Sequence, residues 1–145
     1  MKRIILCADD YGQDPNVSKA IVDLLSHNRL SAVSCMTNSE FWQSYCNLLI
    51  PYKQKVDIGL HLNLTEGKYL TLPGQNMNGL SNYLVKSHLR ILNKNIIKNE
   101  FNAQIDTFEN NIGCLPDFID GHQHIHHLPI VRDAVFDIYQ NRLKK

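Results

Sequence analysis

The sequence predicts an α/β protein whose sheet is mainly parallel, either open or curled into a barrel. Residues 3–8, RIILCA, form a run that is continuously apolar after Arg3, which is typical of a strand buried on both faces. Further runs of this kind alternate along the chain with segments whose apolar residues recur at helical spacing. The length of 145 residues suits one domain with its own core, and we find no internal repeat or interdomain linker.

The first helix is predicted soon after this strand. Asp14 is a suitable N-cap and Pro15 a suitable first helical residue, and the apolar residues that follow have helical spacing. Residues 32–36 are a second short strand. Residues 40–50 are predicted to form a second helix, which Pro51 should end.

The second half of the chain continues the alternation. A long segment rich in Gly, Pro, Asn and Thr interrupts it, and long loops in compact domains are often functional. The predicted elements are a strand at 56–64, this loop at 65–79, helices at 80–93 and 96–112, a strand at 117–120 and a last helix from Pro129.

The composition excludes several classes of partner. Apolar residues make up 43%, charged residues 20%, and the net charge is +1. The chain therefore lacks the charge that binds nucleic acid or an anionic membrane, and no apolar run is long enough to span a bilayer. Four cysteines without zinc-finger spacing, and a start too short and acidic for a signal peptide, indicate reduced thiols in a cytoplasmic protein.

Titratable residues gather where three of the predicted strands end. The first strand runs into ADDYG at residues 8–12, the third contains GLHLN at residues 59–63, and the fourth runs into DGHQH at residues 120–124. The carboxyl ends of parallel strands meet at one edge of a sheet, where ligands and catalytic groups collect. A carboxylate with two imidazoles is a common ligand set for a catalytic divalent metal.

The paired aspartates suit two different tasks at such a site. Neighbouring side chains on an extended backbone point in opposite directions, so Asp9 and Asp10 should not act alike. One can bind the metal while the other serves as a general base.

The histidine run leaves two geometries open. An extended chain would put His122, His124 and His126 on one face, whereas a helix would stack His122 over His126. Each motif also has an ordinary interpretation: a solvated turn for the aspartates, a core histidine for His61 and a solvated loop for the run. Their shared position at strand ends favours the metal site.

Together, ADDYG, GLHLNLT and DGHQHIH resemble the YdjC-like carbohydrate deacetylases, in the order and spacing of that family from Arg3 to about Pro129. The resemblance implies a (β/α) barrel-like scaffold related to the NodB-type deacetylases. It also implies a hydrolase that removes acetyl groups from N-acetylated sugars with a divalent cation.

The resemblance also implies roles for individual residues. Asp10, His61 and His122 would bind the metal, with Asp9 as the general base. His126 would be a further catalytic residue, which supports the metal ligands, contacts the sugar or donates a proton. Three further residues of the motifs would bind substrate, namely Tyr11, Asn63 and His124. The family cation is usually described as Mg²⁺, although two imidazoles suit Zn²⁺ better.

One feature departs from the family. A complete barrel needs about 250 residues, so this chain would supply about the amino-terminal half. We expect such a half-barrel to expose its edge strands and to form homo-oligomers. Two alternatives stay open: another metallohydrolase such as a phosphoesterase, or an inactive metal- or sugar-binding fragment.

Overall fold

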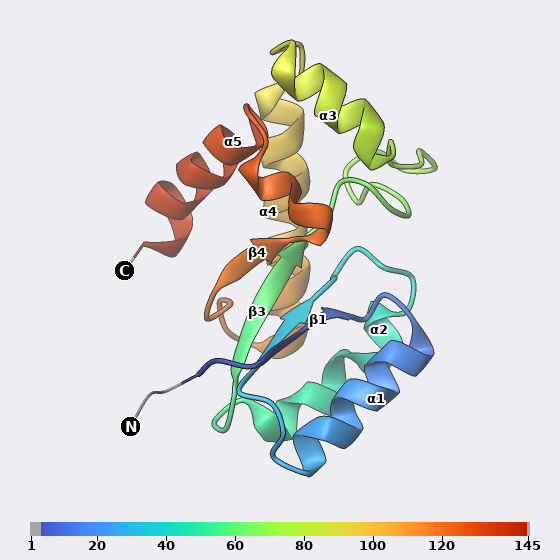
Figure 1. Ribbon diagram of the computed structural model, residues 1–145, viewed down its shortest axis with the longest axis vertical. Coiled ribbons are helices and arrows are strands. Elements are labelled where there is room, and N and C mark those ends of the chain that lie inside the picture. Colours follow the sequence, from blue (N-terminus) through green and yellow to red (C-terminus); the bar gives the residue numbers. More distant parts are fainter. Residues whose placement is uncertain (1–3, 145) are drawn as a thin grey trace.

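The computed structural model describes residues 4–144 and contains one sheet of four parallel strands (Figure 1). The strands are β1 (Cys7–Tyr11), β2 (Ala32–Cys35), β3 (Asp57–Leu62) and β4 (Ile119–Gly121), and they lie side by side in chain order. Each pair is parallel, so all four carboxyl ends reach the same edge of the sheet. The predicted α/β class with a parallel sheet is confirmed.

Helical segments make the crossovers between the strands. Asp14 caps the first helix as predicted, because its Oδ1 accepts a hydrogen bond from the Asn16 amide at 2.7 Å. None of the helices in the described part of the chain is long and apolar enough to cross a membrane. The helices are α1 (Pro15–Ser26), α2 (Trp42–Tyr45), the 3-10 helix η1 (Cys46–Tyr52), α3 (Leu80–His88), α4 (Lys94–Ile112), the 3-10 helix η2 (His122–His127), α5 (Val131–Ile138) and the π-helical turn η3 (Tyr139–Leu143).

The core lies between one face of the sheet and the helices α1 and α4, which contact β1 and β3. Trp42 is fully buried there and stacks on Phe108 with a centroid separation of 6.4 Å. The other face of the sheet lines a hollow of about 430 Å³ whose walls include Cys7, Phe118 and Asp120.

The prediction of a buried strand at residues 3–8 is wrong in its position. Arg3 lies outside the described residues, and β1 begins only at Cys7. Ile4 is 84% exposed, and its two apolar neighbours are exposed as well. An apolar run shows that a segment can be buried, but burial also needs a covering layer. Within residues 4–144, β1 has a strand on only one side, so nothing covers this run.

Two helices also differ from their predicted form. Pro51 does not end the helix at 40–50; it lies inside η1, which continues to Tyr52. A proline removes only its own amide, so a short 3-10 segment tolerates it. The helix predicted at 80–93 ends at His88, while the long loop at 65–79 is confirmed.

Candidate metal centre

The end of β1 brings both aspartates toward His61. The register of β1 against β2 shifts between Ala8 and Tyr11, and Asp10 has a left-handed φ of 63°. This irregularity breaks the simple alternation of side chains expected for an extended strand. As a result, Asp10 groups with His61 and His122, whereas Asp9 groups with His61 and Asp120.

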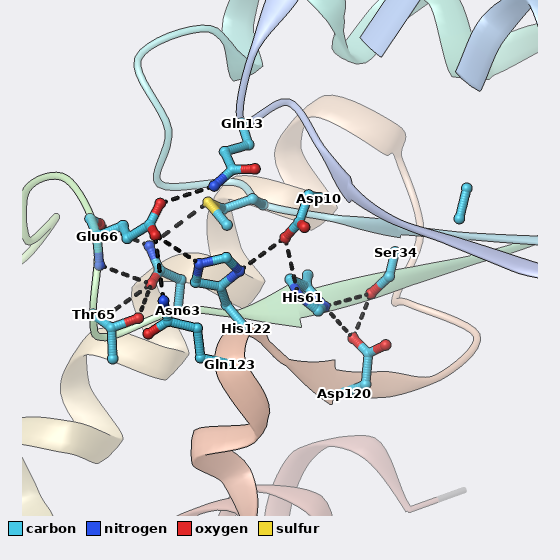
Figure 2. Close-up of polar contacts among 12 residues, drawn as sticks. Asp10, Gln13, Ser34, His61, Asn63, Thr65, Glu66, Asp120, His122 and Gln123 are labelled. Atoms are coloured by element: carbon cyan, nitrogen blue, oxygen red, sulfur yellow. Dashed lines mark hydrogen bonds and ion pairs between the residues drawn. The ribbon is translucent and has the colours of Figure 1, made fainter. Parts of the chain in front are cut away.

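Asp10 on β1, His61 on β3 and His122 directly after β4 converge, as the motifs at the strand ends predict (Figure 2). One oxygen of Asp10, Oδ1, lies 3.2 Å from Nε2 of His61 and 2.8 Å from Nδ1 of His122. One ligand atom from each residue lies within 4.8 Å of the other two. Both rings are nearly buried, with residue exposures of 5% and 7%. The three side chains could therefore hold a single cation.

The mutual contacts shift the acid–base behaviour of all three groups. Hydrogen bonds from His122 and His61 hold the pKa of Asp10 well below its usual value. Burial alone would lower the pKa of His61, but its hydrogen bonds to Asp10 and Asp120 outweigh burial and raise that pKa to about 9. The pKa of His122 is also raised, since its contacts with Asp10 and Glu66 outweigh burial. The cluster thus favours one carboxylate between two imidazolium rings.

Asp120, at the end of β4, fixes the second nitrogen of His61. Its Oδ1 lies 2.7 Å from Nδ1 of His61, and the buried hydroxyl of Ser34 donates to the same oxygen. A carboxylate behind a metal-binding histidine fixes the ring and leaves the other nitrogen free to bind a metal. Asp120 therefore points Nε2 of His61 toward Asp10.

Glu66 is a residue of the centre that the strand-end argument missed. It lies in the loop after β3, and its Oε1 is 3.2 Å from Nε2 of His122. Gln13, after β1, donates to its other oxygen at 2.8 Å. The only signal for Glu66 in the sequence was the expectation that the long loop at 65–79 is functional. The spacing of residues along the chain does not show in which direction a side chain in a loop points.

Two of the residues predicted to bind substrate make contacts that hold the fold. Tyr11 is completely buried, and its hydroxyl donates to the carbonyl of Tyr45 at 2.8 Å. Asn63 is also buried, and its Oδ1 accepts hydrogen bonds from the amides of Thr65 and Glu66. In this structure, Tyr11 packs in the core and Asn63 holds the loop that carries Glu66.

The histidine run has neither of the two geometries expected from the sequence. Gln123 and His124 both have left-handed φ values, which turn the chain sharply after His122. The ring of His126 packs against the backbone of Gly121, and its centroid lies 4.0 Å from the centroid of the His127 ring. Within residues 4–144, no hydrogen bond or ion pair joins His126 to the three converging side chains.

A cleft of about 380 Å³ adjoins the centre on the side of Glu66. Gln13 and Glu66 form its boundary with the centre, and Phe41, Lys68 and Tyr69 lie in its walls. This volume is in the range of small-molecule sites. The cleft therefore offers apolar, amide and charged groups next to the three converging side chains.

Similarity to known proteins shows which family this chain belongs to. Residues 3–145 match the family model described as YdjC-like protein. The chain belongs to the YdjC-like family. The match spans all three motifs at the strand ends, so the candidate metal centre consists of residues inside the region shared with this family.

Relatives of this YdjC-like chain are about twice as long. A carbohydrate deacetylase of Xenopus laevis is 29% identical over 95% of this chain and 47% of its own length. A chitooligosaccharide deacetylase of Proteus mirabilis is 29% identical over 96% of this chain and 56% of its own. The chain thus spans about half the length of the curated relatives that it matches.

A solved structure supports the same fold. A protein from Enterococcus faecalis V583, named for a proposed cleavage of cellobiose-phosphate, superposes with a TM-score of 0.79 at 22% identity. The alignment covers 94% of this chain and 54% of the other. This YdjC-like chain therefore has an α/β fold that recurs in a larger protein, as its resemblance to a barrel-like scaffold implies.

Proposed function

We propose that this chain carries the metal-binding part of a carbohydrate deacetylase, a hydrolase that removes acetyl groups from N-acetylated sugars. The convergence of Asp10, His61 and His122 is the observation that supports this most strongly. The names of the relatives supply the substrate class, since they are called carbohydrate or chitooligosaccharide deacetylases. A small acetylated sugar or oligosaccharide is the proposed substrate.

The proposed cofactor is one divalent metal ion held by Asp10, His61 and His122. Their donor set, one carboxylate oxygen and two imidazole nitrogens, fits such an ion. When bound, the ion would polarise the acetamide carbonyl and make water a better nucleophile. Two imidazoles favour Zn²⁺ over Mg²⁺, which prefers oxygen ligands; Mg²⁺ remains the ion implied by the family resemblance.

Asp9 is the proposed general base. Its exposed carboxylate belongs to the group that includes His61 and Asp120. It therefore lies beside the proposed metal ligands and is not one of them. An ionised carboxylate there can take a proton from the attacking water. Replacing Asp9 with Asn should therefore abolish turnover while leaving metal binding intact.

His126 is the proposed proton donor to the departing amine. Burial and the neighbouring His127 lower its pKa, so its ring is mainly neutral at neutral pH. It can donate only a proton that it has first accepted in the reaction. His124 is exposed after the sharp turn at Gln123 and remains the proposed sugar contact. The cleft beside Glu66 is the proposed site for the sugar ring.

The test is acetate release from N-acetylglucosamine oligomers by the purified chain, supplied in turn with Mg²⁺, Zn²⁺ and Co²⁺. We expect release with at least one ion and none from Asp10→Asn. Release of phosphate from p-nitrophenyl phosphate without acetate release would instead support a phosphoesterase. Metal and sugar binding without any turnover would identify a binding module.

We further propose that the chain self-associates and works in the cytoplasm. β4 has a strand on only one side within the described residues, and α5 and η3 next to it expose Phe136 and Tyr139. A second copy could place its β1 beside this β4. This pairing would cover the apolar surface of α5 and η3 and the exposed apolar residues that precede β1. All four cysteines are free thiols, in keeping with a reducing compartment.

A further inference from the structure

The two histidines of the centre have matching surroundings. Each ring turns one nitrogen toward Oδ1 of Asp10 and the other toward a separate carboxylate. For His61 the second carboxylate is Asp120, 2.7 Å from Nδ1. For His122 it is Glu66, 3.2 Å from Nε2. Figure 2 shows Asp120 and Glu66 on opposite sides of the pair of rings.

We propose that Glu66 is the positioning residue for His122. It would accept the Nε2 proton of that ring and so leave Nδ1 as the nitrogen that binds the metal. This inference rests on the proposed metal centre, and it assigns Glu66 the role at His122 that Asp120 has at His61. Glu66 acts through His122 and is not itself a metal ligand in this scheme.

The surroundings of Nε2 in His122 leave Glu66 as its natural acceptor. This nitrogen is buried and lacks an aligned hydrogen-bond partner among the described residues. Glu66 is close enough for an ion pair, although the contact does not have the alignment of a hydrogen bond. A buried donor without a partner destabilises the fold, because it has lost its hydrogen bonds to water. A small rotation of the Glu66 carboxylate would satisfy it.

The carboxylate of Glu66 is held in place from two other elements, although 44% of its side chain is exposed. Its backbone is fixed by Asn63 at the end of β3, whose Nδ2 donates to the Glu66 carbonyl at 2.8 Å. Its side chain is fixed by Gln13 after β1. A freely rotating surface glutamate would need none of these contacts. They are the arrangement expected for a carboxylate that must stay beside His122.

The experiment measures the Zn²⁺ affinity of the full chain by competition with a chromogenic chelator. Glu66→Ala should weaken Zn²⁺ binding by about 10- to 100-fold, the range for partners of metal-binding histidines. Glu66→Gln keeps an oxygen acceptor but loses the charge, so its loss should be smaller. Gln13→Ala should have the smallest effect of the three, because it only loosens Glu66.

Glu40→Gln is the matched control. Glu40 is an exposed carboxylate that lines the same cleft, and no described hydrogen bond or ion pair involves it. Its replacement should leave Zn²⁺ affinity unchanged. Thermal unfolding of the metal-free variants separates a positioning role from a folding defect, since Glu66→Gln should melt like the wild type while binding Zn²⁺ less tightly.

Three outcomes decide the matter. Weaker Zn²⁺ binding by the Glu66 variants, with unchanged binding by Glu40→Gln and unchanged stability, supports the proposal. Equal Zn²⁺ affinity of Glu66→Ala and the wild type overturns the role of Glu66 and leaves the metal centre standing. A wild-type chain that binds no Zn²⁺, Mg²⁺ or Co²⁺ overturns the metal centre and the role of Glu66 together.

Discussion

Two regions of the molecule differ in whether their side chains find partners within this chain. One is the rim at the carboxyl ends of the strands, and the other is the surface beside β4 and α5. At the rim, both nitrogens of the buried His61 have carboxylate partners, and Asp10 accepts from two rings. Beside β4, a groove of about 680 Å³ has apolar side chains in its walls together with Asp117 and Arg132, and Phe136 there is 58% exposed. The proposed ligands thus come from this chain, whereas none of the residues 4–144 covers the apolar surface. We therefore expect that a substitution can impair turnover while metal binding stays intact.

The largest effect is expected from Asp10→Asn. Asparagine tolerates the left-handed backbone at this position, so the substitution removes the charge with little strain. Without the anionic ligand between the two rings, metal affinity should fall by more than about 100-fold, beyond the range for outer partners. Equilibrium dialysis with Zn²⁺ measures this. Wild-type affinity in this variant would mean that the metal, if any, binds elsewhere.

The pH dependence of stability in EDTA should come next. The pKa of His61 is raised from 6.5 to about 9, so its protonated form stabilises the fold fully below pH 6.5. That contribution, on the order of 3 kcal/mol, is lost as the pH rises from 6.5 to 9. Asp10 has a lowered pKa, so its contribution is lost as the pH falls below about 3.8. The free energy of unfolding, measured in urea, should peak between these limits, and His61→Gln should flatten the alkaline side. A wild-type curve already flat from pH 6.5 to 9 would contradict the cluster.

Asp120→Asn should have a smaller effect than Asp10→Asn on metal affinity. Asparagine can still accept from Nδ1 of His61, but it lacks the charge that fixes the ring. We expect a loss of about 10-fold, at the lower end for such partners. Titration calorimetry with Zn²⁺ tests this beside Asp106→Asn, an exposed carboxylate on α4 paired with Arg142, which should bind Zn²⁺ normally. Equal affinities of the two variants would remove Asp120 from the centre.

The smallest effect on the metal is expected from Phe136→Ser. This change replaces one exposed apolar side chain of the groove with a polar one and leaves the three proposed metal ligands in place. It should shift the chain toward the monomer in light scattering and leave Zn²⁺ affinity unchanged. A wild-type chain that is already monomeric at high concentration would refute the proposed self-association. Loss of Zn²⁺ binding in Phe136→Ser would refute the separation between the two regions.

The sequence predicted most of the parallel sheet and the convergence at the rim. Asp10, His61 and His122 could be found because parallel strands bring their carboxyl ends together, whatever the details of packing. Glu66 could not, since its place depends on the turn made by Asn63 and on the contact with Gln13. The path of the histidine run was equally hidden, because Gln123 and His124 have left-handed φ values that neither an extended strand nor a regular helix contains.

The burial of residues 3–8 was mispredicted for a related reason. Hydrophobic patterning reports what a segment can bury, while the cover itself comes from elsewhere in the fold. The exposed Ile4 and the exposed Phe136 are both apolar side chains of this kind. The local hydrophobic pattern therefore predicted where helices and strands lie. Only the structure showed which of their apolar side chains stay exposed.

A crystal of the chain grown with Zn²⁺ and measured at the zinc absorption edge tests the central idea most directly. The account predicts one anomalous peak in contact with the side chains of Asp10, His61 and His122. A peak held by other residues, or no peak at this rim in Zn²⁺-saturated crystals, would contradict it.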